Sequence, residues 1–357
     1  MRQNAQQIRF CKSRDGTRIA YAVNGSGPPL VRAANWISHL DLDRQNPVWQ
    51  PWLSLFSEKR TLICYDARGC GLSDREQVEF TIDRHVEDLE AVIEAAGVKQ
   101  FALFGMAGGG TIAVTYAVRH PERVSHLVLH GVPADAKLAR GDVEHGQAEI
   151  QAFKFGWAKE NPAFRQLFTS QLLPGATTEQ FDAFNELIRL TTSPANAASI
   201  LRAFFEVSLR ETASLVRCPT LVTHVREDGR VPFVQGRELA SLIPDARFVP
   251  LESKNHVLLE NEPAWQKFVD EFNEFLSTLP TKASVSELQA LADLTERECE
   301  VLDLVAQGFS NPSIGARLGI TEKTVRNQVS MLLSKLGVSS RSQAIVRARE
   351  AGYGRKS

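Results

Sequence analysis

Hydrophobic positions in the first 280 residues alternate between two spacings. Short apolar runs of strand length are separated by stretches in which apolar residues recur at helical spacing. The predicted strands are Ile8–Ser13, Arg18–Asn24, Leu30–Ala34, Thr61–Tyr65, Phe101–Phe104, His126–His130, Thr220–Val225 and Arg247–Leu251. The predicted helices include Thr81–Ala96, Thr111–His120, Gln235–Leu242 and Pro263–Leu276. This alternation favours an α/β fold with a mostly parallel sheet that is covered on both faces.

One long interval departs from the alternation. From Pro133 to Thr212 only helical periodicity is present, which predicts a helical insertion, or cap, at about residues 133–212 over the edge of the sheet. The interval holds eight of the nineteen phenylalanines: Phe153, Phe155, Phe164, Phe168, Phe181, Phe184, Phe204 and Phe205. Most of them are expected to form the core of the insertion, and some to face the space between insertion and sheet.

The last part of the chain reads as a compact set of helices after a polar stretch. Residues 281–290 are predicted to form a linker between a domain at 1–280 and a second domain at 291–357. Thr295 and Glu298 have the spacing of a capping box, with Leu294 and Cys299 placed as a hydrophobic staple. The following helix boundaries are expected at Gly308 (end), Ser310 (start), Gly319 (turn), Thr321 (start) and Gly337 (end), and a fourth helix is expected over 341–350.

Composition and charge limit the classes of function that this chain can have. A chain of 357 residues suits two domains, and neither a signal core nor a membrane-length apolar run is evident, so a cytoplasmic location is expected. Its five scattered cysteines predict reduced thiols rather than a disulfide frame, and no metal or cofactor site is predicted. The net charge of −1 conceals a basic end: residues 307–357 carry nine Lys/Arg against two Glu, or +7. A basic end indicates a polyanion partner.

The helix that starts at Thr321 places polar side chains opposite Val325 and Val329. Arg and Asn read guanine and adenine in the major groove, whereas Lys, Ser and Thr commonly hold phosphates. A solvated surface helix would show a similar face, so this helix alone does not decide the matter. The segment from Leu294 to Arg341 closely resembles the LuxR-type helix-turn-helix domain, and the resemblance covers about sixty residues in all.

That resemblance implies double-stranded DNA as a partner, dimeric binding to two half-sites and RNA polymerase as a further partner. Carried over by position, Arg326, Asn327 and Ser330 would face bases, and Lys323, Thr324 and Lys335 would contact phosphates. The family usually has His where this chain has Gln328, a departure that concerns one backbone contact.

The most informative motif of the first domain is Gly105-Met-Ala-Gly-Gly-Gly110, directly after an apolar strand. A strand that turns sharply through glycines into a helix resembles the nucleophile elbow of α/β-hydrolases, whose signature is Gly-x-Ser-x-Gly. Here Ala107 stands at the nucleophile position, where a methyl group can neither attack a carbonyl nor lose a proton. Asp228 and His256 follow in the order and loop contexts of the triad acid and base.

The resemblance implies an α/β-hydrolase fold with a helical cap, followed by an all-α LuxR-type domain. The chain differs from the family pattern in the segment that supplies part of the oxyanion hole, where Asn35 and Trp36 replace the usual His-Gly. The positions expected to line a ligand pocket are Asn35, Trp36, Met106, Ala107, Gly108 and His256. The expected ligand is a small organic effector, and the aromatic content favours an apolar or aromatic one.

Three functions fit these motifs. The first is a homodimeric transcriptional regulator whose catalytically impaired hydrolase-like domain senses an effector. The second is an active serine esterase or amidase fused to a DNA-binding domain, in which Ala107 replaces the nucleophilic serine. In the third, Asp228 and His256 abstract a proton without a serine.

Overall fold

The computed structural model describes residues 7–35, 37–76, 78–140, 143–157, 161–277 and 294–335, and of the remainder only 338, 340–341, 344–345, 348 and 353–354. Contacts divide the chain into two compact units, Met1–Leu279 and Pro280–Ser357. Each unit is described by itself. In the part of the chain that the structure describes, no helix is long and apolar enough to cross a membrane.

The first unit is built on one eight-stranded sheet in the order β1-β2-β4-β3-β5-β6-β7-β8. The strands are β1 Ile8–Lys12, β2 Arg18–Gly25, β3 Pro29–Arg32, β4 Thr61–Tyr65, β5 Phe101–Met106, β6 Val124–His130, β7 Thr220–Val225 and β8 Arg247–Leu251. The β1–β2 and β2–β4 pairs are antiparallel, and the other five pairs are parallel. The predicted fold class and all eight predicted strands are therefore confirmed.

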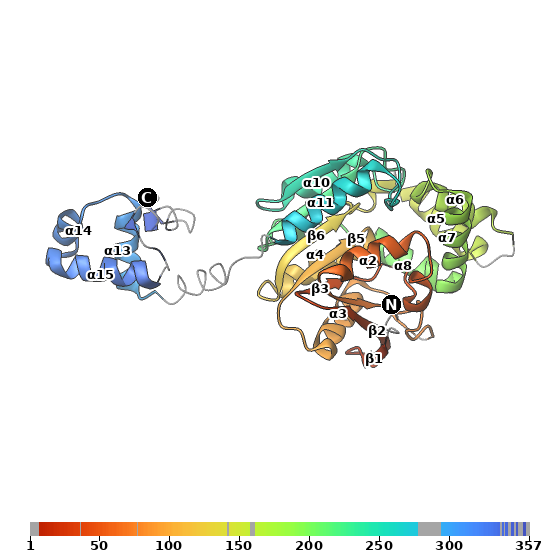
Figure 1. Cartoon of the computed structure of the whole chain (residues 1–357), viewed down its shortest axis with the longest axis horizontal. Helices are drawn as coiled ribbons and strands as arrows, with labels where there is room; N and C mark the ends of the chain where they lie inside the picture. Colours follow the sequence, from red (N-terminus) through yellow and green to blue (C-terminus); the bar gives the residue numbers. More distant parts are fainter. Residues whose placement is uncertain are drawn as a thin grey trace. The chain divides into compact units, whose positions relative to one another are not determined.

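Helices cover both faces of this sheet (Figure 1). Phe104 and Gly105 are consecutive in β5, so they point to opposite faces. Phe104 packs near Trp52 and Phe56, while a methyl group on Gly105 would lie 2.8 Å from Cβ of Ala113. The helices outside the β6–β7 connection are α1 Leu40–Asp43, α2 Trp49–Glu58, α3 Ile82–Ala96, α4 Gly108–Arg119, α10 Phe233–Leu242 and α11 Pro263–Ser277.

The aromatic core on the Phe104 face joins α2 to α11. Trp52 of α2 lies 4.8 Å from Phe268 and 5.0 Å from Trp265, measured between ring centroids. The prediction named no helix at α1 or α2, although Trp49, Trp52 and Phe56 recur at helical spacing. That spacing was the signal that could have found α2.

The connection between β6 and β7 is helical in its described parts. It contains a 3₁₀ turn at Leu138–Arg140, α5 Val143–Gly156, α6 Ala163–Leu172, α7 Thr178–Thr191, α8 Pro194–Phe205 and α9 Arg210–Ala213. Figure 1 shows α5, α6 and α7 gathered at one end of the unit. Five of its eight phenylalanines are buried, namely Phe153, Phe168, Phe184, Phe204 and Phe205, whereas Phe155 is 67% exposed. We call residues 133–212 the cap segment.

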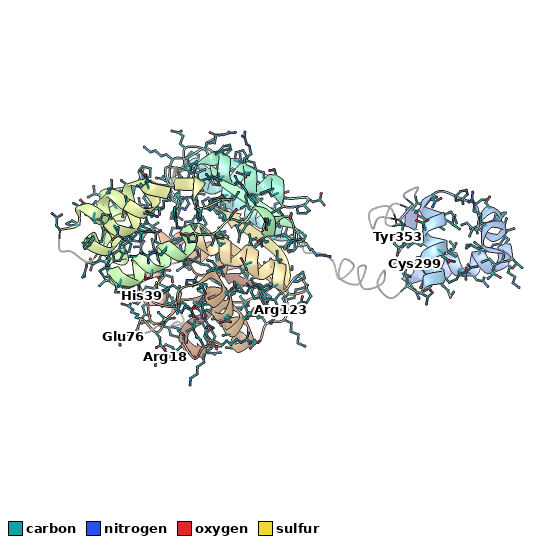
Figure 2. All side chains as sticks on the ribbon, turned by 180° about the vertical axis from the view of Figure 1, so that it is seen from behind. Arg18, His39, Glu76, Arg123, Cys299 and Tyr353 are labelled. Atoms are coloured by element: carbon teal, nitrogen blue, oxygen red, sulfur yellow. The ribbon has the colours of Figure 1, made fainter. Side chains whose placement is uncertain are left out.

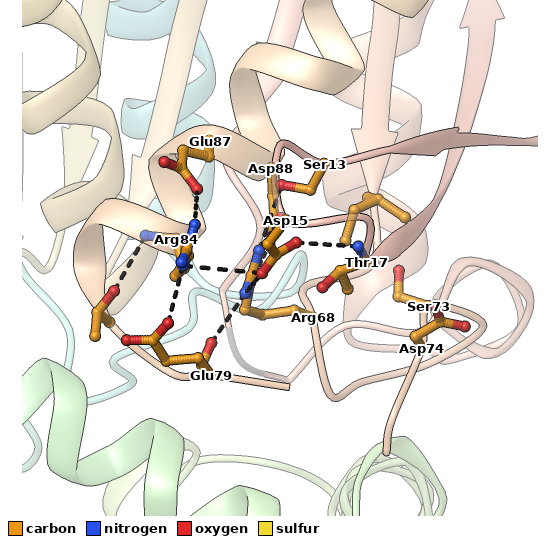
Figure 3. Close-up of polar contacts among 12 residues, drawn as sticks. Ser13, Asp15, Thr17, Arg68, Ser73, Asp74, Glu79, Arg84, Glu87 and Asp88 are labelled. Carbon is orange, nitrogen blue, oxygen red and sulfur yellow. Dashed lines mark hydrogen bonds and ion pairs between the residues drawn. The ribbon is translucent and has the colours of Figure 1, made fainter. Parts of the chain in front are cut away.

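An ion-pair cluster around Arg68 ties the first hairpin to α3 (Figure 3). The Arg68 side chain is fully buried and donates two hydrogen bonds to Asp88, at 2.6 and 2.8 Å. It also donates to Asp15 at 2.8 Å, to the Glu79 carbonyl at 3.0 Å and to Ser13 at 3.3 Å. Because all these acceptors surround one guanidinium, the cluster fixes the loop after β4 against α3.

The second unit contains α13 Glu296–Ala306, α14 Asn311–Leu318 and α15 Glu322–Lys335. Their apolar sides form one core, built from Val301, Leu302, Val305, Ile314, Val325, Val329 and Leu332 among others. The predicted capping box is present, with Thr295 and Glu298 each bonding the other's backbone N–H. Figure 2 shows Tyr353 beside Cys299, and the Tyr353 hydroxyl lies 3.4 Å from the Cys299 sulfur.

Some helix ends in this unit differ from the prediction. The helix α13 has Gln307 as its C-cap, and Gly308 is the next residue, in the left-handed region at φ 89°. Ser310 is the N-cap of α14, but its hydroxyl pairs with that of Ser313 at 2.9 Å rather than with a backbone N–H. The end expected at Gly337 and most of the fourth helix expected at 341–350 lie outside the described residues.

Candidate functional site

The turn at Ala107 keeps the backbone strain of a nucleophile elbow. Ala107 has φ 46° and ψ −123°, which a residue with a side chain rarely adopts, and α4 begins at the next residue. Its N–H donates to the carbonyl of His130 at 3.1 Å. A methyl group on Gly105 would lie 2.6 Å from Cα of Gly110, and one on Gly109 would lie 2.9 Å from the Ala33 carbonyl oxygen. Glycines are required at the turn because strand, helix and neighbouring loop meet there backbone to backbone.

Asp228 and His256 form a buried hydrogen-bonded pair. His256 Nδ1 lies 2.7 Å from Asp228 Oδ2, and the other carboxylate oxygen accepts the N–H groups of Arg230 and Val231 at 2.8 and 2.9 Å. Burial acts to raise the pKa of Asp228, but the His256 ring, its hydrogen bond and the His224 ring outweigh it and lower the pKa to about 2. An ionised carboxylate therefore orients the imidazole, as in a catalytic triad.

The His256 ring lies at the end of β6, the strand that pairs with the elbow strand β5. Gly131 follows His130, the acceptor of the Ala107 N–H, and a methyl group on Gly131 would lie 2.6 Å from Cε1 of His256. His130 Nε2 donates to the His256 carbonyl at 3.0 Å, and its Nδ1 accepts from the Thr223 hydroxyl at 2.8 Å. Burial, then the nearby His256 ring, lowers the pKa of His130 to about 3, so this ring stays neutral.

The structure thus brings Ala107, Asp228 and His256 into one neighbourhood without a nucleophilic atom at position 107. His256 Nε2 is buried and has no hydrogen-bond partner among the described residues. In a triad this atom takes the proton of the serine. The pair can orient a ligand or accept a proton, and the elbow can supply N–H groups and a methyl surface.

A small cavity of about 50 Å³ adjoins the elbow. Its lining comes from the elbow, the β6 exit, the cap segment and the loop after β7: Ala107, Gly108, Thr111, Pro133, Ala136, Ala139, Leu201, Phe204, Arg230 and Val231. The Phe204 ring lies over Gly108, where a methyl group would approach it to 3.2 Å. A larger cavity of about 790 Å³ lies between β2, β4 and the α1–α2 region, where no residue of the Asp228–His256 pair takes part.

Of the predicted pocket residues, only Ala107 and Gly108 line the small cavity. Met106 is buried at the end of β5, and His256 lies beside Gly131. Asn35 is buried, and its side-chain oxygen has no hydrogen-bond partner in the described part of the chain. Trp36 lies outside the described residues. Sequence reasoning missed Arg230 and Val231, although both sit two and three residues after Asp228 in the same motif.

His85 of α3 stacks on Phe204, with ring centroids 5.3 Å apart. Burial lowers the pKa of His85 to about 3, and its Nε2 has no hydrogen-bond partner among the described residues. Because an unfolded histidine titrates near pH 6.5, the unfolded chain binds this proton first as the pH falls. The His85 contribution to the free energy of unfolding is thus lost progressively from pH 6.5 down to about 3.

We therefore expect His85→Leu to be more favourable at low pH than at neutral pH. The measured quantity is the free energy of unfolding of the variant minus that of the parent chain. This difference should be about 2 kcal/mol more favourable to the variant at pH 5 than at pH 7.5. Urea unfolding of both proteins at the two pH values measures this double difference. An equal effect at both pH values would mean that the pKa of His85 is the same in the folded and the unfolded chain.

In the second unit, α15 presents the side chains predicted to meet DNA. Lys323, Thr324, Arg326, Asn327 and Ser330 are exposed, opposite the buried Val325, Val329 and Leu332. Arg326 pairs with Glu322 at 2.9 Å, an exposed contact of small energy. Gln328 is half-buried beneath this face.

Lys335 differs from the other five because it is held within the unit. Its Nζ lies 2.7 and 2.8 Å from the two carboxylate oxygens of Glu298, at the start of α13. The Lys335 ammonium and the Thr295 N–H lower the pKa of Glu298. A phosphate contact by Lys335 must therefore compete with this ion pair.

Comparison with known proteins agrees with this geometry. Residues 41–263 match the family described as alpha/beta hydrolase fold, and residues 292–348 match the family described as bacterial regulatory proteins, luxR family. The chain belongs to the α/β-hydrolase fold family, and its last part is a LuxR-family DNA-binding domain.

Relatives of the two units are distinct. The first is similar to the AB hydrolase superfamily protein YisY of Bacillus subtilis, with 29% identity over 202 residues, covering 54% of this chain and 74% of YisY. The second is similar to the transcriptional regulatory protein DegU of Brevibacillus brevis, with 52% identity over 60 residues, 17% of this chain and only 25% of DegU. An esterase from Exiguobacterium antarcticum has the same fold, with a TM-score of 0.66 and 22% identity over 76% of this chain and all of that one.

Proposed function

We propose that this protein is a DNA-binding transcriptional regulator whose α/β-hydrolase domain binds a small organic effector and thereby controls the DNA-binding domain. The observation that carries the proposal is Ala107 at the strained elbow of a chain that also holds a LuxR-family domain. Backbone strain of about 1–3 kcal/mol persists only where the surroundings impose it. The strain at Ala107 therefore supports a preformed binding site that lacks the nucleophilic atom needed for acyl transfer.

The cavity beside Ala107 supports the effector part of the proposal. It lies where β5 and β7 end, at the sheet edge where α/β folds usually bind ligands. The cap segment contributes Leu201 and Phe204 to its lining, so an occupant would contact the sheet and the cap segment together. Ligand binding changes DNA affinity only if it favours one arrangement of the protein over another.

The exposed polar face of α15 supports the DNA part. Arg326 and Asn327 carry the two side chains that pair bidentately with guanine and adenine. Members of helix-turn-helix families bind two half-sites about one helical turn apart, so we propose a homodimer on a two-fold operator. RNA polymerase belongs to the same proposal as the partner through which bound protein alters transcription.

The test uses the full chain and DNA selected by it from a random pool. Thermal shift with small aromatic and aliphatic compounds identifies ligands, because a ligand of the folded state stabilises it by RT ln(1 + [L]/Kd). Fluorescence anisotropy then measures DNA affinity with and without each ligand. We expect a ligand to change the DNA affinity by about 5- to 150-fold, the usual range of coupling. Failure to bind DNA across a broad range of salt and ligand would overturn the proposal.

A cavity-filling variant assigns the effector to this cavity. Ala107→Leu adds three carbons to a space of about 50 Å³, so we expect it to abolish both the thermal shift and the ligand's effect on DNA. Basal DNA affinity should remain. The same substitution at exposed Ala95 on α3 is the matched control and should leave the ligand response intact. If the ligand still shifts the melting temperature and the DNA affinity of Ala107→Leu, the effector binds at another site.

A second candidate is a serine esterase or amidase, favoured by the intact Asp228–His256 pair. If Ala107 replaces a serine, Ala107→Ser should restore nucleophilic attack on p-nitrophenyl acetate, with one equivalent of p-nitrophenol released in a burst. Ala107→Ser/His256→Gln is the control that should remain inactive. No burst and no turnover in Ala107→Ser would remove the enzyme function.

A further inference from the structure

The cavity beside Ala107 is apolar apart from one cation among its described lining residues. Alanine, proline, leucine, valine and phenylalanine make up most of its lining, and Thr111 and Arg230 are the residues in it with polar side chains. A guanidinium is planar and always charged, and its N–H groups match the two oxygens of a carboxylate. Arg230 is therefore the group that can select the charge of an occupant.

Arg230 is held in place by residues of the cap segment. Its side chain is 10% exposed, lies 4.9 Å from the ring centroid of Phe168, and hydrogen-bonds Glu149 of α5 and Gln171 of α6, the latter at 3.0 Å. Nη1 of Arg230 is the donor in both hydrogen bonds. Its backbone N–H meanwhile bonds Asp228, so the cation is anchored next to the Asp228–His256 pair.

The other edge of the guanidinium is not used within the described part of the chain. Neither Nε nor Nη2 of Arg230 donates a hydrogen bond to a described residue. This edge has the two parallel donors that bind a carboxylate bidentately. The start of α4 at Gly108, also in the lining, adds the positive end of a helix to the cavity.

We propose that the occupant of this cavity is a small carboxylate with an apolar body. Its two oxygens bind the Nε and Nη2 edge of Arg230, and its body packs against Ala107, Leu201 and Phe204. The inference rests on the proposed function, since it names the chemical class of the effector. A cavity of about 50 Å³ is well below the usual 300 to 1,000 Å³ of ligand pockets, so any body larger than a few carbons displaces the cap segment.

Glu149 opposes this binding. It is the carboxylate that already neutralises Arg230, and a second carboxylate on the same guanidinium meets its negative charge. The ligand therefore weakens the link between Arg230 and α5, because one guanidinium is shared by two anions. Removing the charge of Glu149 should strengthen ligand binding, whereas removing the charge of Arg230 should abolish it.

Calorimetric titration of the full chain tests the proposal with matched pairs of probes: butyrate, hexanoate and benzoate against butyramide, hexanamide and benzamide. We expect the acids to bind at least about tenfold more tightly than their amides, since buried charge-assisted hydrogen bonds exceed neutral ones. Arg230→Gln should remove that preference, and Glu149→Gln should raise the affinity for the acids several-fold. Arg210→Gln is the control, because Arg210 pairs with Glu238 outside the cavity lining.

A gain of affinity in Glu149→Gln cannot arise from misfolding, so it supports the proposal independently of Arg230→Gln. Equal binding of acids and amides, unchanged by Arg230→Gln, would overturn the carboxylate assignment and leave the proposed effector function standing if Ala107→Leu still blocks binding. Acid binding that Ala107→Leu does not reduce would instead contradict the effector site itself. No binding of any acid to the parent chain or to Glu149→Gln would also overturn the carboxylate assignment.

Discussion

A chain in which Arg326 and Asn327 are both changed to alanine is expected to lose about a hundredfold or more of its affinity for selected DNA. Each bidentate contact to a base contributes about 1–3 kcal/mol of discrimination, and every 1.4 kcal/mol is a factor of ten. Both side chains are exposed on α15, so their loss leaves the core of Val325, Val329 and Leu332 unchanged. Fluorescence anisotropy on selected and scrambled duplexes measures the change.

The scrambled duplex and Lys323→Ala supply the comparison. The double variant should lose much less affinity for scrambled DNA than for selected DNA, because base contacts carry the sequence preference. Lys323→Ala should weaken both duplexes alike and reduce the salt dependence by about one phosphate contact. If the double variant loses the same affinity for both duplexes, Arg326 and Asn327 contact phosphates rather than bases.

Arg68→Met is expected to lower the free energy of unfolding of the first unit by about 3–5 kcal/mol, the cost of leaving a buried charge without its partner. Asp88 is fully buried and receives two hydrogen bonds from Arg68 (Figure 3). Methionine retains much of the apolar stem but leaves the carboxylate uncompensated. Urea unfolding, followed by the fluorescence of the buried Trp49 and Trp52, measures the loss.

The double variant Arg68→Met/Asp88→Leu separates a lost ion pair from lost packing. Replacing both partners by apolar groups is often close to neutral, so much of the stability should return. The exposed pair Arg189–Glu186 is the control, and Arg189→Met should cost no more than about 1 kcal/mol. A double variant as unstable as Arg68→Met would mean that the shape of the cluster, rather than its charge, holds the loop.

Much of the fold was predictable because its signals are local. The eight strands are short apolar runs, and three of them, Thr61–Tyr65, Thr220–Val225 and Arg247–Leu251, have the predicted ends. The capping box at Thr295 is also a local pattern, since its two members are three residues apart. The helices α1 and α2 were not predicted, although Trp49 and Trp52 show that part of their signal was present in the sequence.

Some features of the candidate site were also predictable from local motifs, whereas others were not. Sequence motifs pointed to Ala107, Asp228 and His256, and the structure places the last two 2.7 Å apart. They gave no indication that Phe204 covers Gly108 or that Lys335 is paired with Glu298. Those contacts join residues 96 and 37 positions apart, and no periodic pattern encodes them.

The sequence by itself determined the order of the elements, the tight glycine turn without a nucleophile, and the polar face of α15, because each depends on neighbours within a few residues. Only the tertiary structure decided what surrounds that turn. Glu149 and Arg230 are 81 residues apart, and their pairing depends on how the cap segment packs against the loop after β7. The size of the cavity and the hydrogen bonds of Arg230 follow from that packing, so the proposed carboxylate class of the effector depends on the tertiary structure.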